Sequence, residues 1–518
     1  MNENRRASLT SYAWLAALAT LVALFVPLAH ASAAPAGGID LAQTEAQAAA
    51  AASTLDAVPE SATNQTTESH TLQVTFSADN GSDAGATINF EVIETTRPSG
   101  VTQEPASCDT GADGTCTSGE YTAVDVGKDL IRAYHDANDN GQFDEGEAND
   151  LVTKTWTDGT GEVTRLEGIT RIQTAIDISE DLFPDPGSAP AAVLARADVY
   201  ADALAGAPFA DEQDAPVLLT FPDHLYNETD NAQRNTKAEL QRILGNDGNK
   251  TVYLLGGETA LSQQVQADVL ALGYKTVRIA GPTRIETAVQ IADELGNPSN
   301  LLVTTAYNFP DALSAGAAAA ADHVNGAVLL TTAGEKHPAT QAYLTQHADA
   351  AVYSIGGPAV NPYAEGPGED DPDTDESIYG PGRIETAVFA AEFFFTDPTD
   401  VGIARADDFP DSLTGGRHIA DQGGGGPIIL TKTDHLHVSI VGEPPFDAAR
   451  RYLCANADSV QTAWIYGGQV AVADHTEGEV LAAIQGEPDA EDGCTFPGEW
   501  DAFPGRPDTH FGEQAATP

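Results

Sequence analysis

One segment of the chain has the spacing of a twelve-residue calcium-binding loop. Oxygen-bearing side chains stand at positions one, three, five, nine and twelve, glycine stands at position six, and position seven would offer its backbone carbonyl. The residues before the loop, 129–134, alternate as a strand does, so we expect a structural calcium site in a β-module and not an EF-hand. An Asx-rich hairpin without metal is the alternative. The predicted ligands are Asp136, Asn138, Asn140, Gln142, Asp144 and Glu147.

A second group of charged residues recurs three times along the chain. Each aspartate follows an apolar run and begins a predicted helix, at the sheet edge where open α/β folds bind ligands. The aspartates could accept hydrogen bonds from the hydroxyl groups of a polymer, helped by the recurring arginines. Alternatively, each aspartate stabilises a helix N-terminus and each arginine pairs with an acid, and we favour this structural interpretation. The six residues are Arg171, Asp202, Arg284, Asp311, Arg383 and Asp411.

The other motifs give little support to catalysis. Asp434-His435-Leu436-His437 has two histidines but no matched third ligand, so we interpret it as a polar loop. The sequence has no Gly-x-Ser-x-Gly, His-Glu-x-x-His or Walker motif, and its double glycines do not form Gly-x-Gly-x-x-Gly. We therefore predict a protein without enzymatic activity. A hydrolase that uses only carboxylates is the second hypothesis.

These residues lie on a repeated unit that must position them. Four blocks recur in the same order three times: Arg-Ile-x-Thr-Ala, aromatic-x-Asp-Ala/Ser-Leu, Leu-Leu-Thr or Ile-Leu-Thr, and Gly-Gly. The apolar runs do not alternate, as in strands covered on both faces, and helical stretches separate them. Thr-x-x-Gln/Glu capping boxes at Thr170 and Thr283 begin two of the helices. The pattern predicts three flavodoxin-like α/β domains with parallel sheets.

The blocks resemble the cell-wall-binding repeat type 2, which occurs in threes on secreted bacterial surface proteins. The resemblance covers about residues 165–485. It implies that three repeats pack in a monomer around a pseudo-threefold axis and hold the protein non-covalently to an anionic wall glycopolymer. Residues 66–158 alternate with period two and predict a small antiparallel β-sandwich. That segment looks like the bacterial Ig-like modules of surface adhesins.

The charge of the chain restricts its partners. The 78 acidic and 24 basic side chains give a net charge of −54. Such a surface repels nucleic acid. It is suited to a salty medium that screens self-repulsion, so we infer a halophilic or halotolerant source, and a surface that collects cations is the alternative. A polyanionic ligand would also be repelled unless salt screens the charges or a cation bridges them.

The termini and cysteines indicate export. Arg5 and Arg6, an apolar run from Trp14 to Leu28 and a small-residue site ending at Ala33 predict a signal peptide. We expect no transmembrane segment in the mature chain. Four cysteines suit an oxidising compartment, and local disulfide pairing is the simplest hypothesis. A zinc site is the alternative, which the absence of a Cys-x-x-Cys pair disfavours. They are Cys108, Cys116, Cys454 and Cys494.

We therefore expect a secreted, cell-surface protein that its repeats anchor to a cell-wall or envelope glycopolymer. Its cofactor would be structural calcium alone. A secreted wall hydrolase, or an adhesin whose Ig-like module binds a partner, are the alternatives. The expected segments are signal peptide 1–33, disordered linker 34–65, β-sandwich 66–158, repeats 164–281, 282–380 and 381–486, and an acidic Pro/Gly-rich tail 487–518.

Overall fold

The computed structural model describes most of the chain beyond residue 52. The described residues are 53–59, 61–66, 68–78, 83–138, 140–225, 234–333, 336–357, 359, 376–436, 447–486, 494–496 and 506. The predicted signal peptide lies outside them. Within them, no helix is both long enough and apolar enough to cross a bilayer.

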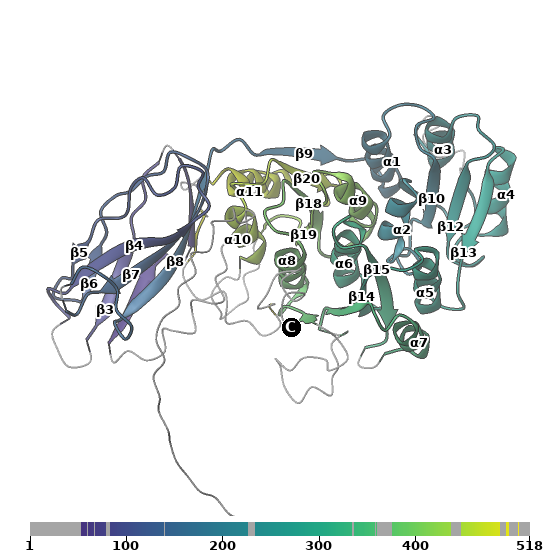
Figure 1. The fold of residues 1–518 in the computed structure, drawn as a ribbon. Coiled ribbons are helices and arrows are strands. Elements are labelled where there is room, and N and C mark those ends of the chain that lie inside the picture. The colour runs from purple at the N-terminus through teal and green to yellow at the C-terminus, as the bar shows by residue number, and fades with distance from the viewer. Residues whose placement is uncertain are drawn as a thin grey trace, which may run out of the picture. The chain divides into compact units, whose positions relative to one another are not determined.

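The segment predicted as a β-sandwich forms two sheets that share one apolar core. The core includes Val74, Phe76, Ile88, Ile131 and Trp156, all at most 3% exposed. Inward side chains alternate along the strands, as the period-two pattern predicts. One sheet has the order β1-β3-β6 and the other β21-β2-β8-β7-β4-β5 (Figure 1). The strands are β1 (Thr54–Val58), β2 (Ser61–Gln65), β3 (Gln73–Ser77), β4 (Thr87–Thr95), β5 (Cys108–Asp109), β6 (Thr115–Thr117), β7 (Gly127–His135), β8 (Asn149–Thr157) and β21 (Thr495–Phe496).

Two boundaries differ from the sequence-based expectation. Strands β1 and β2 lie inside the predicted linker 34–65, because β1 pairs with β3 and β2 pairs with β8, partners that local composition does not reveal. Part of the predicted tail 487–518 is also paired, since β21 joins β2. The Cys454–Cys494 disulfide ties this part of the tail to the third repeat, and Cys108–Cys116 closes a loop of the β-module.

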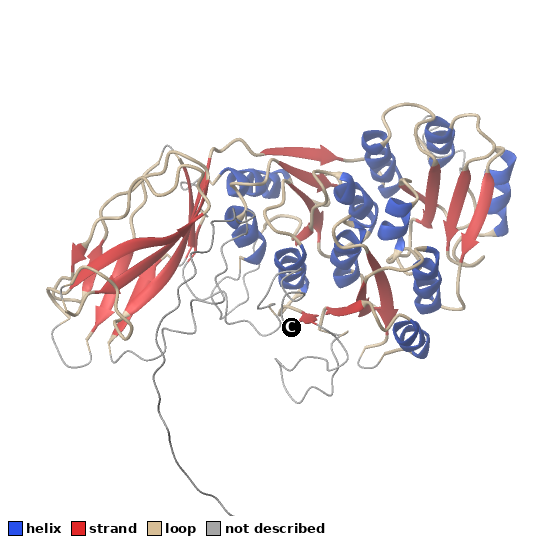
Figure 2. Ribbon diagram, viewed as in Figure 1, coloured by secondary structure: helices blue, strands red, loops and turns tan. Residues whose placement is uncertain are grey.

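The repeat region contains three four-stranded sheets in which every pairing is parallel. Their orders are β11-β10-β12-β13, β15-β14-β16-β17 and β19-β18-β20-β9. Helices flank the strands (Figure 2). The strands are β9 (Glu162–Leu166), β10 (Ala191–Arg196), β11 (Val217–Thr220), β12 (Thr251–Leu255), β13 (Lys275–Ile279), β14 (Asn300–Thr305), β15 (Gly326–Thr331), β16 (Ala351–Ile355), β17 (Glu376–Ile378), β18 (Asp400–Arg405), β19 (Ile428–Thr431) and β20 (Thr462–Tyr466).

The repeats exchange strands in a closed cycle. The strand that precedes the first helix of one repeat completes the sheet of the repeat before it. Thus β13 pairs with β12, β17 pairs with β16, and β9, which comes before the first repeat, pairs with β20 of the third. Each sheet therefore depends on chain from two repeats, and the first and third repeats are joined by backbone hydrogen bonds.

Small residues allow three helices to pack closely where the repeats meet. Helices α2, α6 and α9 contact one another, and Ala207, Ala320 and Ala420 form a shared buried cluster. A Cβ on Gly416 would lie 3.3 Å from the Ala207 side chain. The helices of the repeat region are α1 (Arg171–Leu182), α2 (Gly206–Glu212), α3 (Thr236–Leu244), α4 (Gln263–Ala271), α5 (Arg284–Glu294), α6 (Pro310–Ala320), α7 (Pro338–Gln346), α8 (Arg383–Phe394), α9 (Pro410–Asp421), α10 (Ala448–Ala455) and α11 (Asp474–Gln485).

The predicted helix starts occur where the capping residues stand. The Thr283–Glu286 capping box is complete, as expected. Thr170 caps α1 through the backbone N–H of Gln173, but the Gln173 side chain accepts from Ile169 and not from Thr170. Gly382 begins α8 without a side-chain cap.

Candidate functional site

The three recurring arginines occupy equivalent positions at the carboxyl edges of the sheets. Each stands at the first residue of its helix and donates from Nη1 to the carbonyl just after a central strand. Arg171 donates to Ala197 at 2.9 Å, Arg284 to Ala306 at 3.0 Å and Arg383 to Ala406 at 2.7 Å. A guanidinium group has five N–H donors in a planar fork. The carbonyl therefore orients the group and uses only part of its donor capacity.

The aromatic residues of the second repeated block meet at one place. Tyr200 and Phe309 have ring centroids 5.5 Å apart, Tyr200 and Phe409 5.4 Å, and Phe309 and Phe409 6.1 Å. These edge-on and tilted geometries are favourable for aromatic pairs. We call this group the aromatic triangle. Each of its members comes from a different repeat.

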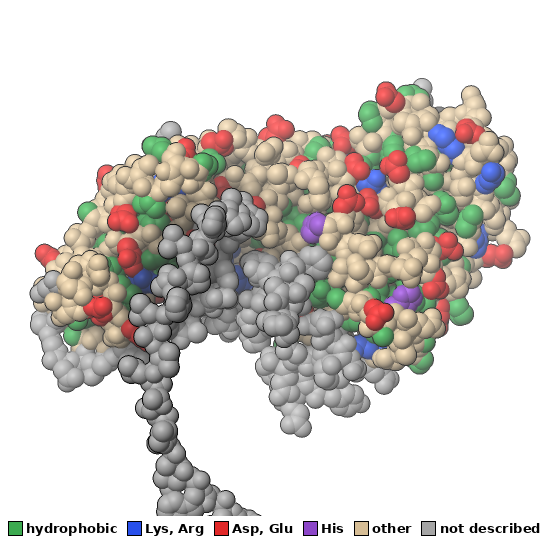
Figure 3. Space-filling model, in the orientation of Figure 1, with side chains coloured by type: hydrophobic (Ala, Val, Ile, Leu, Met, Phe, Trp, Pro, Cys, Tyr) green, Lys and Arg blue, Asp and Glu red, His purple; other side chains and the backbone are tan. Residues whose placement is uncertain are grey.

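Each arginine lies over an aromatic ring of the preceding repeat. Arg284 is 5.7 Å from the Tyr200 ring centroid, Arg383 is 5.7 Å from that of Phe309, and Arg171 is 5.5 Å from that of Phe409. These distances are within the range of cation–π attraction. Three cationic groups thus surround the aromatic triangle, in a chain whose net charge is −54. On the face of the molecule that Figure 3 shows, acidic side chains are more common than basic ones.

The three aspartates lie deeper, between the repeats. Asp202 accepts a 3.0 Å hydrogen bond from Thr287 of the second repeat, and Thr174 of the first repeat bonds to Asp411. Asp311 is 7% exposed. Burial raises the pKa of Asp311 to about 6, while Arg383 opposes the shift, and burial likewise raises the pKa of Asp411 to about 6. The contacts of Asp202 and Asp411 with neighbouring repeats were not expected from the sequence. Asp311 and Asp411 also lie in the first turns of α6 and α9, where a carboxylate favours the helix N-terminus.

The double glycines fit against these aspartates. Gly256, Gly356 and Gly467 have φ values of +97°, +92° and +100°. A Cβ on Gly356 would lie 2.1 Å from Oδ2 of Asp311, and one on Gly467 would lie 2.5 Å from Oδ2 of Asp411. The first glycine of each pair is required both by its conformation and by the carboxyl group beside it.

A pocket of about 460 Å³ lies next to Arg171 in the first repeat. Its lining combines the N-terminal end of α1 with the segments that follow β10 and β11, which is the carboxyl edge of the sheet. Arg171 also lies 3.4 Å from Asp408 of the third repeat. The pocket is lined by charged, amide and apolar side chains, a combination that suits a ligand with both polar groups and apolar ring faces. Its lining includes Ile169, Arg171, Asp198, Phe221, Arg234 and Asn235.

The predicted calcium loop connects β7 to β8 and is closed by its own acidic residues. Oδ2 of Asp144 lies 2.6 Å from the amide nitrogens of Asn138 and Asn140. Glu147 accepts from the backbone N–H groups of Ala137 at 2.9 Å and Asp144 at 3.0 Å. The loop lies in the β-module, between the antiparallel strands β7 and β8. Asp136 accepts from the backbone N–H groups of Asn140 and Gly141, so side chains of five of the six predicted ligands take part in hydrogen bonds within the loop. Gln142 enters only through its backbone, whose N–H donates to Asn140.

Comparison with known proteins identifies the repeats. The family model of cell wall binding domain 2 matches residues 165–266, 278–364 and 377–477. The chain belongs to this family. The matches confirm the resemblance based on the repeated blocks, with three tandem copies. The protein is therefore a cell-wall-associated surface protein.

Curated relatives and solved structures agree with this assignment. An N-acetylmuramoyl-L-alanine amidase, LytC, of Bacillus subtilis (strain 168) is 27% identical over 278 residues, which are 53% of this chain and 51% of the amidase. An amidase enhancer of the same organism is 29% identical over 174 residues, 34% of this chain and 22% of that protein. The chain thus spans about half of the first relative and about a fifth of the second.

The structural neighbours show that the fold is shared. Cwp8 from Clostridium difficile has a TM-score of 0.52 and 17% identity, covering 84% of this chain and 93% of Cwp8. Cwp6 from the same organism has a TM-score of 0.51 and 18% identity, covering 84% of this chain and 68% of Cwp6. Both support a multidomain α/β protein with several sheets.

Sequence reasoning selected the arginines and aspartates but did not foresee their partners. The aromatic residue of each block was visible as part of the repeat, yet nothing in its spacing indicated that Tyr200, Phe309 and Phe409 would meet. The recurrence of an aromatic at the same position in all three copies was the available signal.

Proposed function

We propose that the protein is held non-covalently at the cell envelope by a wall glycopolymer that binds the arginine–aromatic face of the repeats. That face consists of the aromatic triangle with Arg171, Arg284 and Arg383. We further propose that the repeats are arranged with pseudo-threefold symmetry in a monomer. The closed cycle of strand exchange and the cyclic pairing of each arginine with the preceding repeat support this arrangement.

The observation that carries the proposal is the three oriented guanidinium groups around one aromatic cluster. Arginine recognises phosphate and carboxylate groups with two parallel hydrogen bonds, and the aromatic triangle holds the three guanidinium groups in place by cation–π contacts. The exposed Tyr307, 63% accessible, lies 5.9 Å from Arg284 and extends the same face. Local positive charge also reduces the repulsion between an anionic polymer and a chain of net charge −54.

The six predicted polymer-binding residues divide by role in this proposal. The arginines contact the polymer, whereas Asp202, Asp311 and Asp411 hold neighbouring repeats in register. Their hydrogen bonds across repeats and the burial of Asp311 support this division.

Co-sedimentation of the full chain with purified envelopes at several salt concentrations tests the anchoring. We expect binding by the wild type and a loss of more than about tenfold in affinity when all three arginines are changed to glutamine, because arginines at binding sites often contribute over 1 kcal/mol each. Arg132→Gln is the control for loss of an arginine outside this face, to be compared with each single substitution, since Arg132 lies in the β-module and pairs with Glu91 at 2.6 Å. Failure of the wild type to sediment at every salt concentration would refute the proposal.

A role in wall hydrolysis is the second candidate, since one relative is an amidase and another is an amidase enhancer. Non-catalytic anchoring is preferred because the sequence has no Gly-x-Ser-x-Gly, His-Glu-x-x-His or Walker motif. Release of peptide or reducing-sugar ends from purified walls by the full chain would favour the hydrolase.

We propose that the β-module is Ig-like, is exported with the repeats and faces away from the wall, and that calcium stabilises its β7–β8 loop. The amide oxygen and nitrogen of Asn are nearly indistinguishable by shape. A half-turn of the amide groups of Asn138 and Asn140 would exchange each nitrogen for an oxygen beside the Asp144 carboxylate. Three oxygen ligands would then lie together, as calcium binding requires. Binding of a partner by the β-module alone would favour the adhesin alternative.

A further inference from the structure

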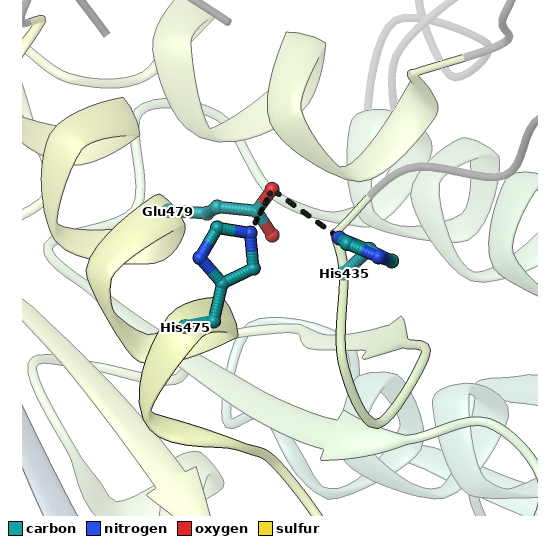
Figure 4. Close-up of side chains that lie close together, drawn as sticks. All are labelled: His435, His475 and Glu479. Carbon is teal, nitrogen blue, oxygen red and sulfur yellow. Dashed lines mark ion pairs between the residues drawn. The ribbon is translucent and has the colours of Figure 1, made fainter. Parts of the chain in front are cut away.

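A histidine-rich cluster in the third repeat lies apart from the arginine–aromatic face. It joins the segment that follows β19 to helix α11. His475 and Glu479 stand one turn apart on α11, and His435 approaches Glu479 from the facing segment (Figure 4). The cluster was not evident in the sequence, because the third ligand lies more than forty residues from His435.

We propose that His435, His475 and Glu479 bind a divalent transition-metal ion of the zinc type. Nε2 of His475 lies 3.5 Å from Oε1 of Glu479, Nδ1 of His435 lies 3.9 Å from the same oxygen, and one donor atom from each residue lies within 4.8 Å of the others. Ligands of a tetrahedral zinc ion at about 2.0–2.1 Å lie about 3.4 Å apart. Side-chain movements of about 1 Å would therefore complete the site.

The state of Glu479 is the independent observation that indicates a cation. Its side chain is 8% exposed. Oε2 accepts a 2.7 Å hydrogen bond from the backbone of Leu436, but Oε1 meets no hydrogen-bond donor among the described residues. Nη2 of Arg450 forms an ion pair with Oε1 at 3.6 Å, a distance too long for a hydrogen bond. A buried carboxylate oxygen without a donor is costly, and a metal ion at the meeting point of the two imidazoles would satisfy it.

The surrounding backbone holds the ligands in place. Thr433 accepts hydrogen bonds from the Ala473 N–H at 2.7 Å and from the Thr476 hydroxyl at 3.0 Å, which fix the segment bearing His435 against α11. Asp434 lies 3.8 Å from Nε2 of His435, on the side opposite Glu479. At hydrogen-bond distance, about 2.9 Å, this carboxylate would accept from the imidazole N–H and orient a metal-bound His435.

The donor set selects the class of metal. Two imidazoles and one carboxylate favour zinc and its neighbours over calcium or magnesium, which prefer oxygen ligands alone. Three protein ligands leave a coordination position for water. All four cysteines are in disulfides, so no thiolate of this chain competes for the ion.

The first repeat provides an internal comparison. There Leu225 donates to Asp268 as Leu436 donates to Glu479, and Ser262 donates to Pro222 as Ala473 donates to Thr433. The residue at the position of His475 is Gln264, whose amide donates to Asp268 at 2.7 Å. The first repeat thus satisfies its carboxylate with an amide, whereas the third repeat presents a second imidazole.

Zinc titration of the untagged, oxidised full chain tests the site, with His475→Gln as the key variant. This substitution introduces the residue type that the first repeat has at this position, and the His475 side chain is 64% exposed. Without metal, the variant should therefore have the same Tm as the wild type. We expect one high-affinity zinc ion per chain by calorimetry, a zinc-dependent rise in Tm, and a loss of about tenfold or more in zinc affinity in His475→Gln and in Glu479→Gln. His224→Asn, at the position of His435 in the first repeat, should bind zinc as the wild type does.

Two results would overturn the proposal. One is absence of zinc binding by the wild type at micromolar zinc. The other is unchanged affinity in His475→Gln, which would place any bound zinc elsewhere and leave the cluster as an ion pair between histidines and Glu479.

Discussion

Replacing Gly356 with alanine should destabilise the second repeat strongly. Gly356 has φ of +92°, and an added Cβ would lie 2.1 Å from Oδ2, 2.4 Å from Cγ and 2.9 Å from Cβ of Asp311. The backbone conformation alone costs an L-residue about 1–2 kcal/mol. Forcing a methyl group against a buried side chain adds about 1–3 kcal/mol. We therefore expect a loss of about 2–5 kcal/mol in the free energy of unfolding.

The neighbouring glycine supplies the matched control. Gly357 has no heavy atom within 4 Å of an added Cβ and does not adopt a positive φ, so Gly357→Ala should change stability by less than about 0.5 kcal/mol. Urea unfolding followed by circular dichroism measures both variants. Adding Asp311→Ala to Gly356→Ala should recover part of the loss, because it removes the two nearest atoms. Equal destabilisation by the two glycine variants, or no coupling with Asp311, would refute the reasoning.

Three other perturbations have clear expected results. Burial raises the pKa of Asp311 to about 6, so protonated Asp311 stabilises the folded protein at low pH and this contribution is lost as pH rises through that value. Relative to wild type, the free energy of unfolding of Asp311→Asn should therefore increase by up to about 3 kcal/mol between about pH 4 and 7, as measured by urea unfolding. Arg405 lowers the pKa of Asp407 below its ordinary value of 3.8, so the stabilising contribution of Asp407 is lost only as pH falls below about 4. The stability difference between Asp407→Asn and wild type should therefore stay constant between about pH 4 and 7, and equal slopes for the two variants would contradict this explanation. Calcium should raise the Tm of the wild type and of Glu145→Gln, whose substitution lies in the loop but not at a ligand position. It should not change the Tm of Glu147→Gln, which lacks a predicted ligand. If calcium did not change the Tm of the wild type, the loop would be a metal-free hairpin. Molar potassium chloride should raise the unfolding midpoint, since salt screens a net charge of −54, and a midpoint independent of salt would argue against a salt-adapted chain.

The local structure was largely predictable because neighbouring residues encode it. Non-alternating apolar runs indicated buried parallel strands, as in β14 and β15, where every residue is buried. The Thr283–Glu286 box placed the start of α5 correctly. The linker and tail were predicted less well, because β1, β2 and β21 are ordered by partners distant in sequence.

By itself, the sequence determined the three-copy α/β organisation, the family and the residue types of the candidate sites. Tertiary structure alone decided which copies touch: β9 completes the sheet of the third repeat, each arginine lies over an aromatic of the preceding repeat, and His435 meets His475 and Glu479. The physical reason is that periodicity and capping act over a few residues, whereas these contacts arise only when three similar units close on one another. Three equivalent positions in the sequence become one aromatic triangle, and a histidine on α11, where the first repeat has Gln264, becomes part of a candidate metal site.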